Sequence, residues 1–382
     1  MRIIRGMVYT DRMCFEPGEI AIEGERIERV ERCEDSTLTE KEAQTYILPG
    51  LVDIHFHGCA GYDFCDGTAE AVRVIASYEM THGTTTICPA TMTLPEERLL
   101  EICAAGAAAA ETEVLAEGIP LQDVMRGIYL EGPFLSREKK GAQNPAYLRK
   151  PDLAMLERLQ EAARGMIRMV AVAPEEDGAM ELIKKGAGAF RFSIAHTCAD
   201  YETAKAAMEA GAHHVTHLYN AMPSFTHRNP GVIGAAAENE ETRAELICDG
   251  IHIHPCVVRN TFQLFGLERM VLISDSMMAT GMEDGEYALG GQPVTVRGNL
   301  ALLKDGTIAG SATNLYDCMR TAIRMGVPKE AVVRAVTMNP AQAVGLEAEC
   351  GLLSPGRRAD ILLADEEFAL LEVIKSGRTV KG

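Results

Sequence analysis

Short apolar runs that alternate with helix-forming stretches constrain the fold of this chain more than any other feature. The predicted strands are residues 52–57, 84–88, 127–130, 166–172, 191–196, 214–217, 244–248 and 270–274. Helix-forming stretches lie between them, at residues 68–81, 95–112, 153–164 and 199–209. Such alternation is typical of parallel βα units. Eight strands in this order predict an α/β fold, a (β/α)8 TIM-like barrel, with its chemistry at the carboxyl ends of the strands.

The two ends of the chain contain short strands and turns instead. Neither end has enough apolar residues to fold alone, so we expect one small β-sandwich domain built from both termini. The predicted boundaries are residues 1–50 and 351–382 for this domain and residues 51–350 for the barrel. Residues 283–310 are rich in glycine and polar residues, and we expect them to form an insertion after the eighth strand, close to the active face.

Composition excludes several classes of partner. The formal net charge of −18, without a basic stripe, argues against binding to nucleic acid or acidic membrane surfaces. The 11 cysteines include no CxxC pair and lie in apolar segments, which favours a reducing compartment. No apolar run approaches the roughly 20 residues that span a bilayer. We therefore expect a cytoplasmic protein that does not contact membranes.

The first predicted strand ends in the motif His55-Phe56-His57. Alternate side chains of a strand point the same way, so the two imidazoles could face one metal ion. An isolated His-x-His is weak support for a metal site, because a core histidine can also satisfy itself by hydrogen bonding. The position of this motif at a strand end, before Gly58, favours metal binding.

Three further predicted strands end in residues of the types that bind metal ions in proteins. Glu131, His196 and His217 each directly follow an apolar run. A barrel gathers such strand ends on one face. Two neutral imidazoles and a carboxylate form a conventional zinc or iron set with a coordination position left for water. A solvated loop glutamate is the alternative for Glu131 alone, but a purely structural role for all three residues is improbable.

Asp275 follows the eighth predicted strand. It could be a helix N-cap. Beside a divalent ion it would act as a general base on a water whose pKa the ion lowers. His82, His213 and His254 have no comparable placement, and we assign them structural roles.

The loops after the sixth and seventh strands are rich in hydrogen-bond donors and cations. They contain Asn220, Ala221, Arg228 and His252. Each could be ordinary turn chemistry or a solvated side chain. Together they predict a pocket suited to phosphate, despite the acidic protein as a whole.

With these residues placed, the chain resembles the N-acetylglucosamine-6-phosphate deacetylases of the amidohydrolase superfamily over nearly its full length. The motifs that carry the resemblance are residues 49–58, 130–134, 140–145, 215–222, 248–252 and 308–311. The runs 130–134 and 216–222 are specific to this family. Residues 338–341 and 351–360 recur throughout the superfamily and indicate only the fold.

The resemblance implies roles for individual residues. Those matching Glu131, His196 and His217 bind the catalytic metal, and the one matching Asp275 is the acid/base. The implied contacts to a phosphorylated amino sugar are Ala142, Asn220, Ala221, Arg228, His252, Ile308, Ala309 and Gly310. Family members commonly form homodimers, in which a phosphate contact can come from the partner subunit.

Metal number and one catalytic position vary within the family. Some members lack the first histidine pair and use one ion, whereas this chain keeps His55 and His57, so one or two divalent ions are expected. Zinc is favoured, with iron, cobalt and manganese as alternatives. Some members carry a histidine where this chain has Gln143, whose amide could donate a hydrogen bond to the developing oxyanion.

The expected activity is metal-dependent hydrolysis of N-acetylglucosamine 6-phosphate to glucosamine 6-phosphate and acetate, in amino-sugar catabolism. Cyclic-amide or dipeptide hydrolysis would use the same barrel and metal but would not need Arg228 and His252. A non-catalytic scaffold of the same fold is the other alternative, although such proteins usually lose metal ligands and this chain retains all of them. Fold alone does not separate these functions.

Overall fold

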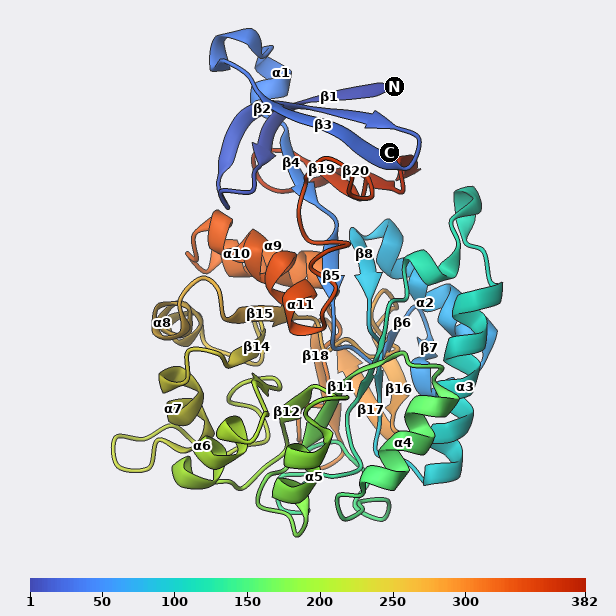
Figure 1. Cartoon of the computed structure of the whole chain (residues 1–382), viewed down its shortest axis with the longest axis vertical. Helices are drawn as coiled ribbons and strands as arrows, with labels where there is room; N and C mark the ends of the chain where they lie inside the picture. The colour runs from blue at the N-terminus through green and yellow to red at the C-terminus, as the bar shows by residue number, and fades with distance from the viewer.

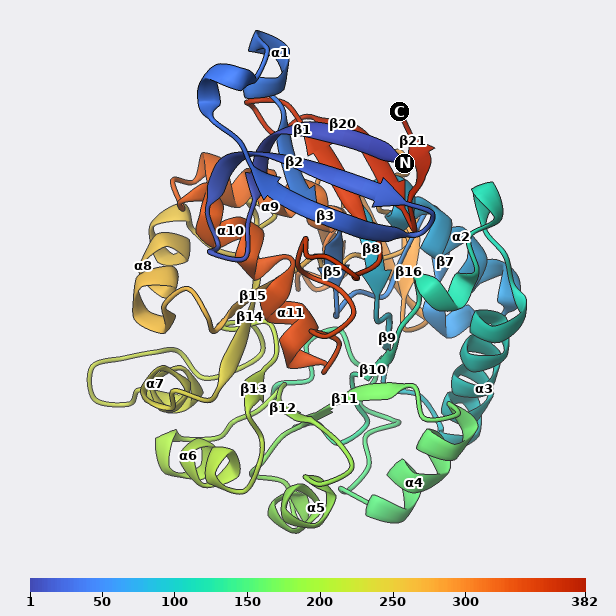
Figure 2. The ribbon, with the colours of Figure 1, turned by 45° about the horizontal axis from the view of Figure 1, so that its top comes forward.

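A curled sheet of parallel strands forms the centre of the molecule in the computed structural model, which describes residues 1–382. Its seven strands are β9 (Ala90–Thr91), β10 (Ile128–Leu130), β11 (Ile167–Val172), β12 (Phe192–Ile194), β13 (His214–Val215), β14 (Arg243–Ile247) and β15 (Met270–Ile273), and a separate parallel pair, β5 (Leu51–Asp53) and β8 (Thr84–Ile87), precedes them in the barrel. They follow one another around an arc (Figure 2). Every predicted strand is present, although most are shorter than predicted, and the α/β TIM-like barrel is confirmed.

Hydrogen bonds between the segments that follow β5 and β15 bring the first and last strands of the barrel together. The Asp275 backbone N–H donates to the His55 carbonyl at 3.1 Å, and the His57 N–H donates to the Ser276 carbonyl at 2.7 Å. The buried Asp53 carboxylate also accepts the Ser274 hydroxyl at 2.6 Å. These bonds join the predicted His-x-His motif to the segment that carries Asp275.

Helices cover the outside of the barrel (Figure 1). They are α2 (Ala69–Thr81), α3 (Glu96–Thr112), α4 (Leu153–Ala162), α5 (Ala179–Gly186), α6 (Tyr201–Glu209), α7 (Gly231–Glu238), α8 (Pro255–Phe265), α9 (Leu315–Arg324), α10 (Lys329–Ala335) and α11 (Met338–Ala343). Side chains of Thr68, Asp152, Asp200 and Asn314 cap the starts of α2, α4, α6 and α9, as expected for these residue types. None of the helices combines the length and apolarity that a membrane crossing requires.

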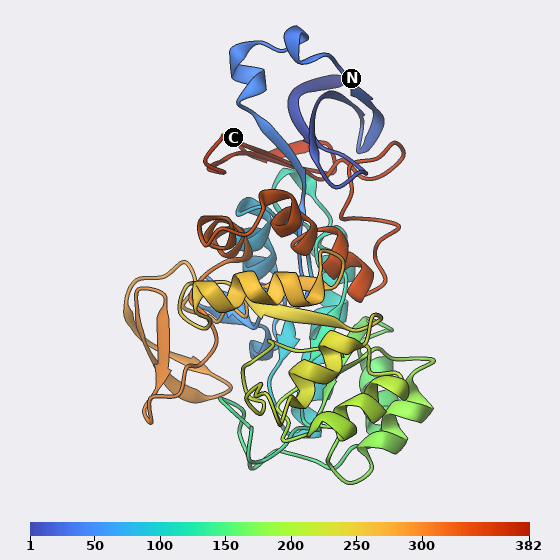
Figure 3. The ribbon, with the colours of Figure 1, turned by 90° about the vertical axis from the view of Figure 1, so that its left-hand side faces the viewer.

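Strands from both chain ends share a second sheet with the order β21-β20-β19-β4-β1-β2-β3. Its members are β1 (Arg2–Tyr9), β2 (Phe15–Glu23), β3 (Arg26–Arg32), β4 (Tyr46–Pro49), β19 (Ile361–Ala364), β20 (Leu370–Lys375) and β21 (Arg378–Lys381), with η1 (Asp35–Thr37) and α1 (Glu40–Ala43) between β3 and β4. The antiparallel pair β4–β19 joins the two termini. This sheet lies at one end of the molecule (Figures 1 and 3).

The chain passes from this sheet into the barrel through Gly50. A side chain is excluded there, because a Cβ would lie 2.1 Å from the Thr85 hydroxyl oxygen. The Gly50 N–H donates to the Asp360 carbonyl at 2.9 Å, which ties the entry strand to the C-terminal segment. The small sheet and the barrel are thus connected at one tightly packed point.

A three-stranded antiparallel sheet follows β15, as predicted for the insertion. It comprises β16 (Gly285–Leu289), β17 (Gln292–Arg297) and β18 (Leu300–Leu303). Its buried Leu289 and Val294 share a core with Met92 and Met277, and it stands out from the barrel in Figure 3. The remaining short elements are β6 (Gly58–Cys59), β7 (Tyr62–Asp63), η2 (Phe64–Asp66), η3 (Ala116–Gly118) and η4 (Leu121–Asp123).

Candidate metal centre

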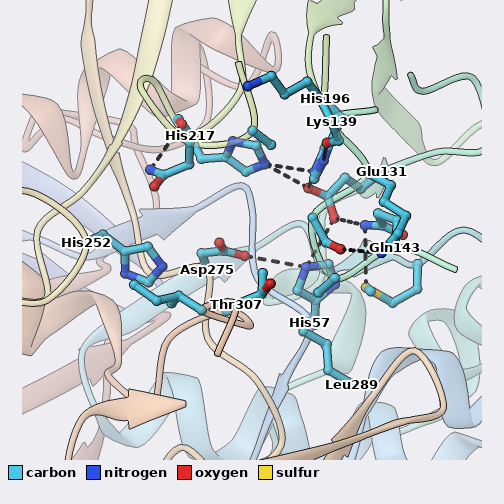
Figure 4. Close-up of a pocket in the computed structure, with 18 of the residues that line it drawn as sticks. His57, Glu131, Lys139, Gln143, His196, His217, His252, Asp275, Leu289 and Thr307 are labelled. Atoms are coloured by element: carbon cyan, nitrogen blue, oxygen red, sulfur yellow. Dashed lines mark hydrogen bonds and ion pairs between the residues drawn. The ribbon is translucent and has the colours of Figure 1, made fainter. Parts of the chain in front are cut away.

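The Glu131 carboxylate lies at the centre of a buried group of imidazoles (Figure 4). It directly follows β10, and His196 and His217 follow β12 and β13. Glu131 Oε1 is 3.1 Å from the Nε2 atom of each histidine, and these two nitrogens are 3.1 Å apart. The Nδ1 atom of His196 donates to the Lys139 carbonyl at 2.8 Å. That bond leaves the lone pair of His196 Nε2 facing Glu131.

His55 and His57 bring a second set of nitrogens to the same carboxylate. His57 Nε2 lies 3.3 Å from Glu131 Oε2 and 3.4 Å from Asp275 Oδ1. His55 Nε2 lies 3.4 Å from Glu131 Oε1 and 3.9 Å from Asp275 Oδ1. The structure therefore places all six predicted metal and acid/base residues in one cluster, with Glu131 shared between two possible groups of ligands.

Glu245 on β14 holds two histidines of this cluster in place by hydrogen bonds. Its carboxylate accepts hydrogen bonds from His55 Nδ1 at 2.8 Å, from His214 Nε2 at 2.9 Å and from the His217 backbone N–H at 3.1 Å. The first of these bonds fixes the His55 tautomer so that Nε2 carries the lone pair directed at Glu131 and Asp275. The ring of Tyr129 stacks on His55 with 4.5 Å between centroids.

Three of the clustered residues have left-handed backbone conformations. The φ angles are 44° at His196, 28° at His217 and 49° at Asp275. Such values are unfavourable for residues with a Cβ atom and persist only where the surrounding structure enforces them. Each residue lies two positions beyond the end of a strand, so the turn of the backbone directs its side chain toward the cluster. Strain concentrated at three strand ends is typical of a functional site.

The electrostatics of the cluster favour a positive charge. Burial alone would lower the pKa of His57, but hydrogen bonds and charges from Asp275 and Glu131 raise it to about 10. Burial would also lower the pKa of His55, but the charges of Glu245 and Glu131 raise it well above its ordinary value. Glu131 shows the reverse, because the histidines outweigh its burial and hold its pKa well below the usual range. The carboxylates thus remain ionised and attract a cation into the site.

The donor atoms fit a divalent metal ion. His55 Nε2 is fully buried and has no hydrogen-bond partner, although it points at two carboxylates. Two histidine nitrogens and a carboxylate oxygen from Glu131, His196 and His217 lie within 4.8 Å of one another, and so do the donors of His55, His57 and Glu131. Neutral imidazole and carboxylate are the ligands that ions such as zinc and iron accept.

A cavity of about 490 Å³ opens over the cluster. This volume is typical of a site for a small ligand. Six of the residues predicted to contact substrate line it, namely Ala142, Asn220, Ala221, His252, Ile308 and Gly310. His252 is held by Asp249, whose carboxylate lies 2.7 Å from Nδ1. Burial would lower the pKa of His252, but the bond to Asp249 raises it, which favours a cationic imidazole facing the cavity.

Two predicted substrate contacts lie elsewhere. Arg228 is exposed and lines a different hollow, beside Asp200 and Glu238, between the start of α6 and the loop that precedes α7. Ala309 is fully buried behind the cavity wall that Ile308 and Gly310 form. Within a single chain, the structure therefore does not bring Arg228 and His252 to the same cavity.

Comparison with known proteins identifies the group to which this chain belongs. Residues 46–380 match the sequence pattern of the Amidohydrolase family. The chain is 35% identical to the N-acetylglucosamine-6-phosphate deacetylase of Bacillus subtilis over 97% of its own length and 94% of the relative's. The chain belongs to the amidohydrolase family, among the N-acetylglucosamine-6-phosphate deacetylases.

Two further comparisons place this amidohydrolase more finely. It is similar to a mutant of the Mycobacterium smegmatis deacetylase solved in complex with N-acetyl-D-glucosamine-6-phosphate, with a TM-score of 0.90, 33% identity and coverage of 100% and 99% of the two chains. It is also 30% identical to an N-acetylgalactosamine-6-phosphate deacetylase of Escherichia coli over 90% of its length and 89% of the relative's. These similarities, with the complete ligand set, favour an enzyme over a non-catalytic scaffold.

Gln143 occupies a particular place in this amidohydrolase. Its side chain is buried, and its Nε2 donates to Glu131 Oε2 at 2.6 Å. Its Oε1 accepts the Thr93 N–H at 2.7 Å. The sequence predicted a donor to the substrate, whereas the structure gives the amide two protein partners.

The sequence analysis missed several residues of the amidohydrolase site. Glu245 was overlooked because it lies inside an apolar strand, where a charged side chain is itself a signal of a buried pair. Arg137, Lys139 and Lys140 line the cavity and supply cationic groups from the same chain. Their basic side chains, just before and at the start of the recognised motif 140–145, could have identified them.

Proposed function

We propose that this amidohydrolase removes the acetyl group of N-acetylglucosamine 6-phosphate, giving glucosamine 6-phosphate and acetate in amino-sugar catabolism. The observation that carries the proposal is the convergence of Glu131, His196, His217 and Asp275 at the floor of a cavity of about 490 Å³. The named relatives supply the substrate class. The enzyme hydrolyses a carbon–nitrogen bond of a linear amide.

The metal ligands we propose are Glu131, His196 and His217, with His55 and His57 available for a second ion. Zinc is the ion we favour, with iron, cobalt or manganese as alternatives. When bound, a divalent cation supplies Lewis-acid polarisation of the acetyl carbonyl and lowers the pKa of a water molecule. The fixed tautomers of His55 and His196 prepare their Nε2 atoms for this role.

Asp275 is the acid/base in this proposal. The bond and charge of His57, with the charge of His55, outweigh burial and lower the pKa of Asp275, so its carboxylate is ionised and ready to accept a proton. It takes a proton from the attacking water and returns it to the leaving amine nitrogen, so one carboxylate serves both halves of the reaction. General acid–base catalysis of this kind contributes roughly 10²–10⁴-fold to a rate.

The sugar phosphate lies at the opposite side of the cavity in this proposal. Cationic His252 meets the phosphate, while Asn220, Ala221 and Ala142 contact the sugar. The remaining proposed contacts are Ile308, Ala309 and Gly310, with Ala309 acting through its backbone because its side chain is buried.

Arg228 reaches the phosphate only across a subunit boundary in this proposal. Its side chain is exposed outside the cavity of its own chain, and exposed Phe225 lies on the same loop. We therefore propose a homodimer in which Arg228 of one subunit contributes to the cavity of the other.

Three further proposals concern organisation. We divide the chain into a barrel of residues 51–350 and a small domain of residues 1–50 and 351–382. We propose that the small domain is a β-sandwich formed by its one seven-stranded sheet folding on itself, so that buried residues from both segments, Ile20 and Ile361 among them, share one core. We propose a cytoplasmic enzyme, which agrees with its eleven unpaired cysteines.

The Asp275→Asn variant tests the central assignment. We expect acetate release to fall by about 10²–10⁴-fold, while metal content, measured by elemental analysis, stays at the wild-type level. Asp305→Asn, in an exposed turn of the insertion, is the control and should be fully active. Undiminished acetate release by Asp275→Asn would refute the assigned role.

Substrate choice and the dimer are tested together. Arg228→Ala should weaken binding of the phosphorylated sugar far more than binding of unphosphorylated N-acetylglucosamine. Analytical ultracentrifugation of the wild-type protein should report a dimer. Equal losses on both sugars would place the phosphate elsewhere. N-acetylgalactosamine 6-phosphate is the competitor to include, because one relative is named for it; faster turnover of that epimer would reassign the substrate.

A further inference from the structure

Asp249 is a buried carboxylate that holds both the backbone and the ring of His252. Its side chain is fully buried, and it lies two residues beyond the end of β14. Oδ1 accepts the backbone N–H groups of Ile251 and His252 at 2.9 Å and 3.0 Å. Oδ2 lies 2.7 Å from the Nδ1 atom of His252. Because the two N–H groups engage Oδ1, Oδ2 is the oxygen committed to the imidazole.

This arrangement decides which nitrogen of His252 keeps its hydrogen. The bond and charge of His252 outweigh burial and lower the pKa of Asp249, so the carboxylate is ionised. An ionised carboxylate only accepts hydrogen bonds, so Nδ1 of His252 must carry a hydrogen. The ring therefore titrates at Nε2, the nitrogen left for a ligand in the cavity. The cationic ring donates from Nε2, whereas the neutral ring presents a lone pair there.

Two carboxylates, Asp249 and Asp275, act on the charge of the His252 ring. Burial lowers the pKa of His252, but the bond and charge of Asp249, with a smaller contribution from Asp275, raise it above the ordinary value of 6.5. The His252 side chain is only 6% exposed, and it lines the cavity together with Asp275. The ring is therefore cationic near neutral pH and becomes neutral only on the alkaline side.

We propose that Asp249 is a positioning residue that makes recognition of a phosphate ester depend on pH: it holds the Nδ1 hydrogen of His252, so only the cationic ring can donate to the phosphate from Nε2. The inference rests on the proposed function, which places the phosphate at His252. A phosphate ester is close to a dianion above its second pKa of about 6, so its own charge is nearly constant at alkaline pH. Loss of one hydrogen bond to a charged group corresponds to about 10–100-fold in affinity.

Isothermal calorimetry of the Zn²⁺-loaded full chain with glucose 6-phosphate, from about pH 7 to about pH 10, tests the inference. This probe has neither an acetamide to hydrolyse nor an amine that titrates. The affinity of the wild type should fall about 10–100-fold across the range, as His252 loses its Nε2 hydrogen.

The Asp249→Asn variant separates the charge of His252 from its orientation. The backbone N–H groups of Ile251 and His252 keep the asparagine oxygen in the place of Oδ1, so its NH2 group faces the ring. Nδ1 must then accept, and the hydrogen of the neutral ring moves to Nε2. Affinity should be lower than that of the wild type at about pH 7 but unchanged up to about pH 10. Asp365→Asn is the matched control, because Asp365 also accepts two backbone N–H groups but no imidazole, and it should keep the wild-type fall.

Three results would overturn the inference: no binding of glucose 6-phosphate by the wild type, an affinity that stays constant with pH, or an equally steep fall in Asp249→Asn. If that variant does not fold, nitrogen-15 NMR of histidine-labelled wild type decides, with the His252 signals assigned from His252→Asn. A neutral ring that carries its hydrogen on Nε2 would overturn the inference, and one that carries it on Nδ1 would support it. Acetate release reports the proposed function separately: a wild type with the expected pH dependence that releases no acetate would refute the function and leave this inference standing.

Discussion

Glu245 and Glu79 are both fully buried in this protein, yet their surroundings are opposite. Glu245 accepts three hydrogen bonds, two of them from histidine rings. Burial alone would raise its pKa, but the charge of His55 and the bonds from His214 and His55 lower it to about 2. Neither oxygen of Glu79, on α2, has a hydrogen-bond partner. Burial and the neighbouring Asp53 raise its pKa to about 8, against smaller contributions from Thr84 and Cys59.

The comparison separates burial from function. Burial in both cases leaves one carboxyl ionised and the other protonated near neutral pH, because only Glu245 faces three donors, from the segments around β5 and β13. The ionised Glu245 supports His55 and His217, two of the proposed metal ligands, whereas the protonated Glu79 lies on the buried face of α2. The number of hydrogen-bond donors around a buried carboxyl group, and not its degree of burial, therefore distinguishes the candidate site in this fold.

Removing Glu245 should have the largest effect. Glu245→Ala leaves His55, His214 and the His217 N–H without their shared acceptor, and breaking a buried pair in this way costs about 3–5 kcal/mol. Metal affinity should fall about 10–100-fold, because His55 loses its fixed tautomer. Urea unfolding and elemental analysis measure the two effects. Glu241→Ala, at an 80% exposed side chain on the approach to the same strand, is the control and should be neutral.

Glu79→Gln should shift stability in the opposite direction. The folded-state pKa of about 8 exceeds the ordinary value of 4.5, so the wild type loses stability as pH rises from the lower value through the upper one. A glutamine side chain has no proton to release and stays neutral at every pH. At about 1.4 kcal/mol per pKa unit, reduced by local relaxation, we expect the variant to be more stable by about 2 kcal/mol at high pH.

The prediction for Glu79 is tested by how the stability difference between Glu79→Gln and the wild type changes with pH. The advantage of Glu79→Gln over the wild type should be full at pH 8.5 and should disappear at pH 3.5, below the ordinary pKa of 4.5, where the Glu79 carboxyl is neutral in both the folded and the unfolded protein. Urea unfolding at the two pH values measures it. An equal advantage at both would show that Glu79 is not protonated in the folded state and would remove the contrast with Glu245.

A smaller effect should follow from removing one of the three donors to Glu245. His214→Asn takes away the bond to Oε1, and with two donors left the loss should be about 1–2 kcal/mol. Chemical denaturation measures it. His213→Asn, at the neighbouring half-exposed histidine, is the control. A loss as large as that of Glu245→Ala would mean that the carboxylate depends on His214 alone.

Tyr129→Phe should have the smallest effect. The variant loses the hydroxyl bond to Thr216 at 2.6 Å but keeps the ring that stacks on His55. We expect a loss of about 1 kcal/mol with unchanged metal content. Tyr62→Phe, which loses only a surface bond to Glu70, is the control. A fall in metal content would show that the hydroxyl, and not the ring, orients His55.

The strand-end residues could be predicted from the sequence, whereas their supporting contacts could not. His55, Glu131, His196, His217 and Asp275 follow apolar runs, and a barrel brings such ends together whatever their order along the chain. The support of His55 by Glu245 depends on two positions 190 residues apart becoming neighbours across the closed barrel, which no local pattern specifies.

The position of Arg228 shows a different limit. The sequence places it in a loop after the sixth predicted strand, the same class of loop that carries His252. The prediction that both line one pocket assumed that all such loops turn inward. Within one chain Arg228 instead lines a separate hollow, to which Pro223 and Pro230 also contribute. The direction of a loop depends on its packing, which residue types alone do not determine.

The shared terminal sheet has a consequence for synthesis of the protein. Strand β4 pairs with β19, so residues 1–50 must wait for residues 361–381 to be synthesised before their sheet is complete. The residues of the barrel lie between these two segments and are synthesised in the meantime. A stop codon that removes only β19 to β21 would therefore leave β4 as an open edge strand, while β1 to β4 would still pair with one another.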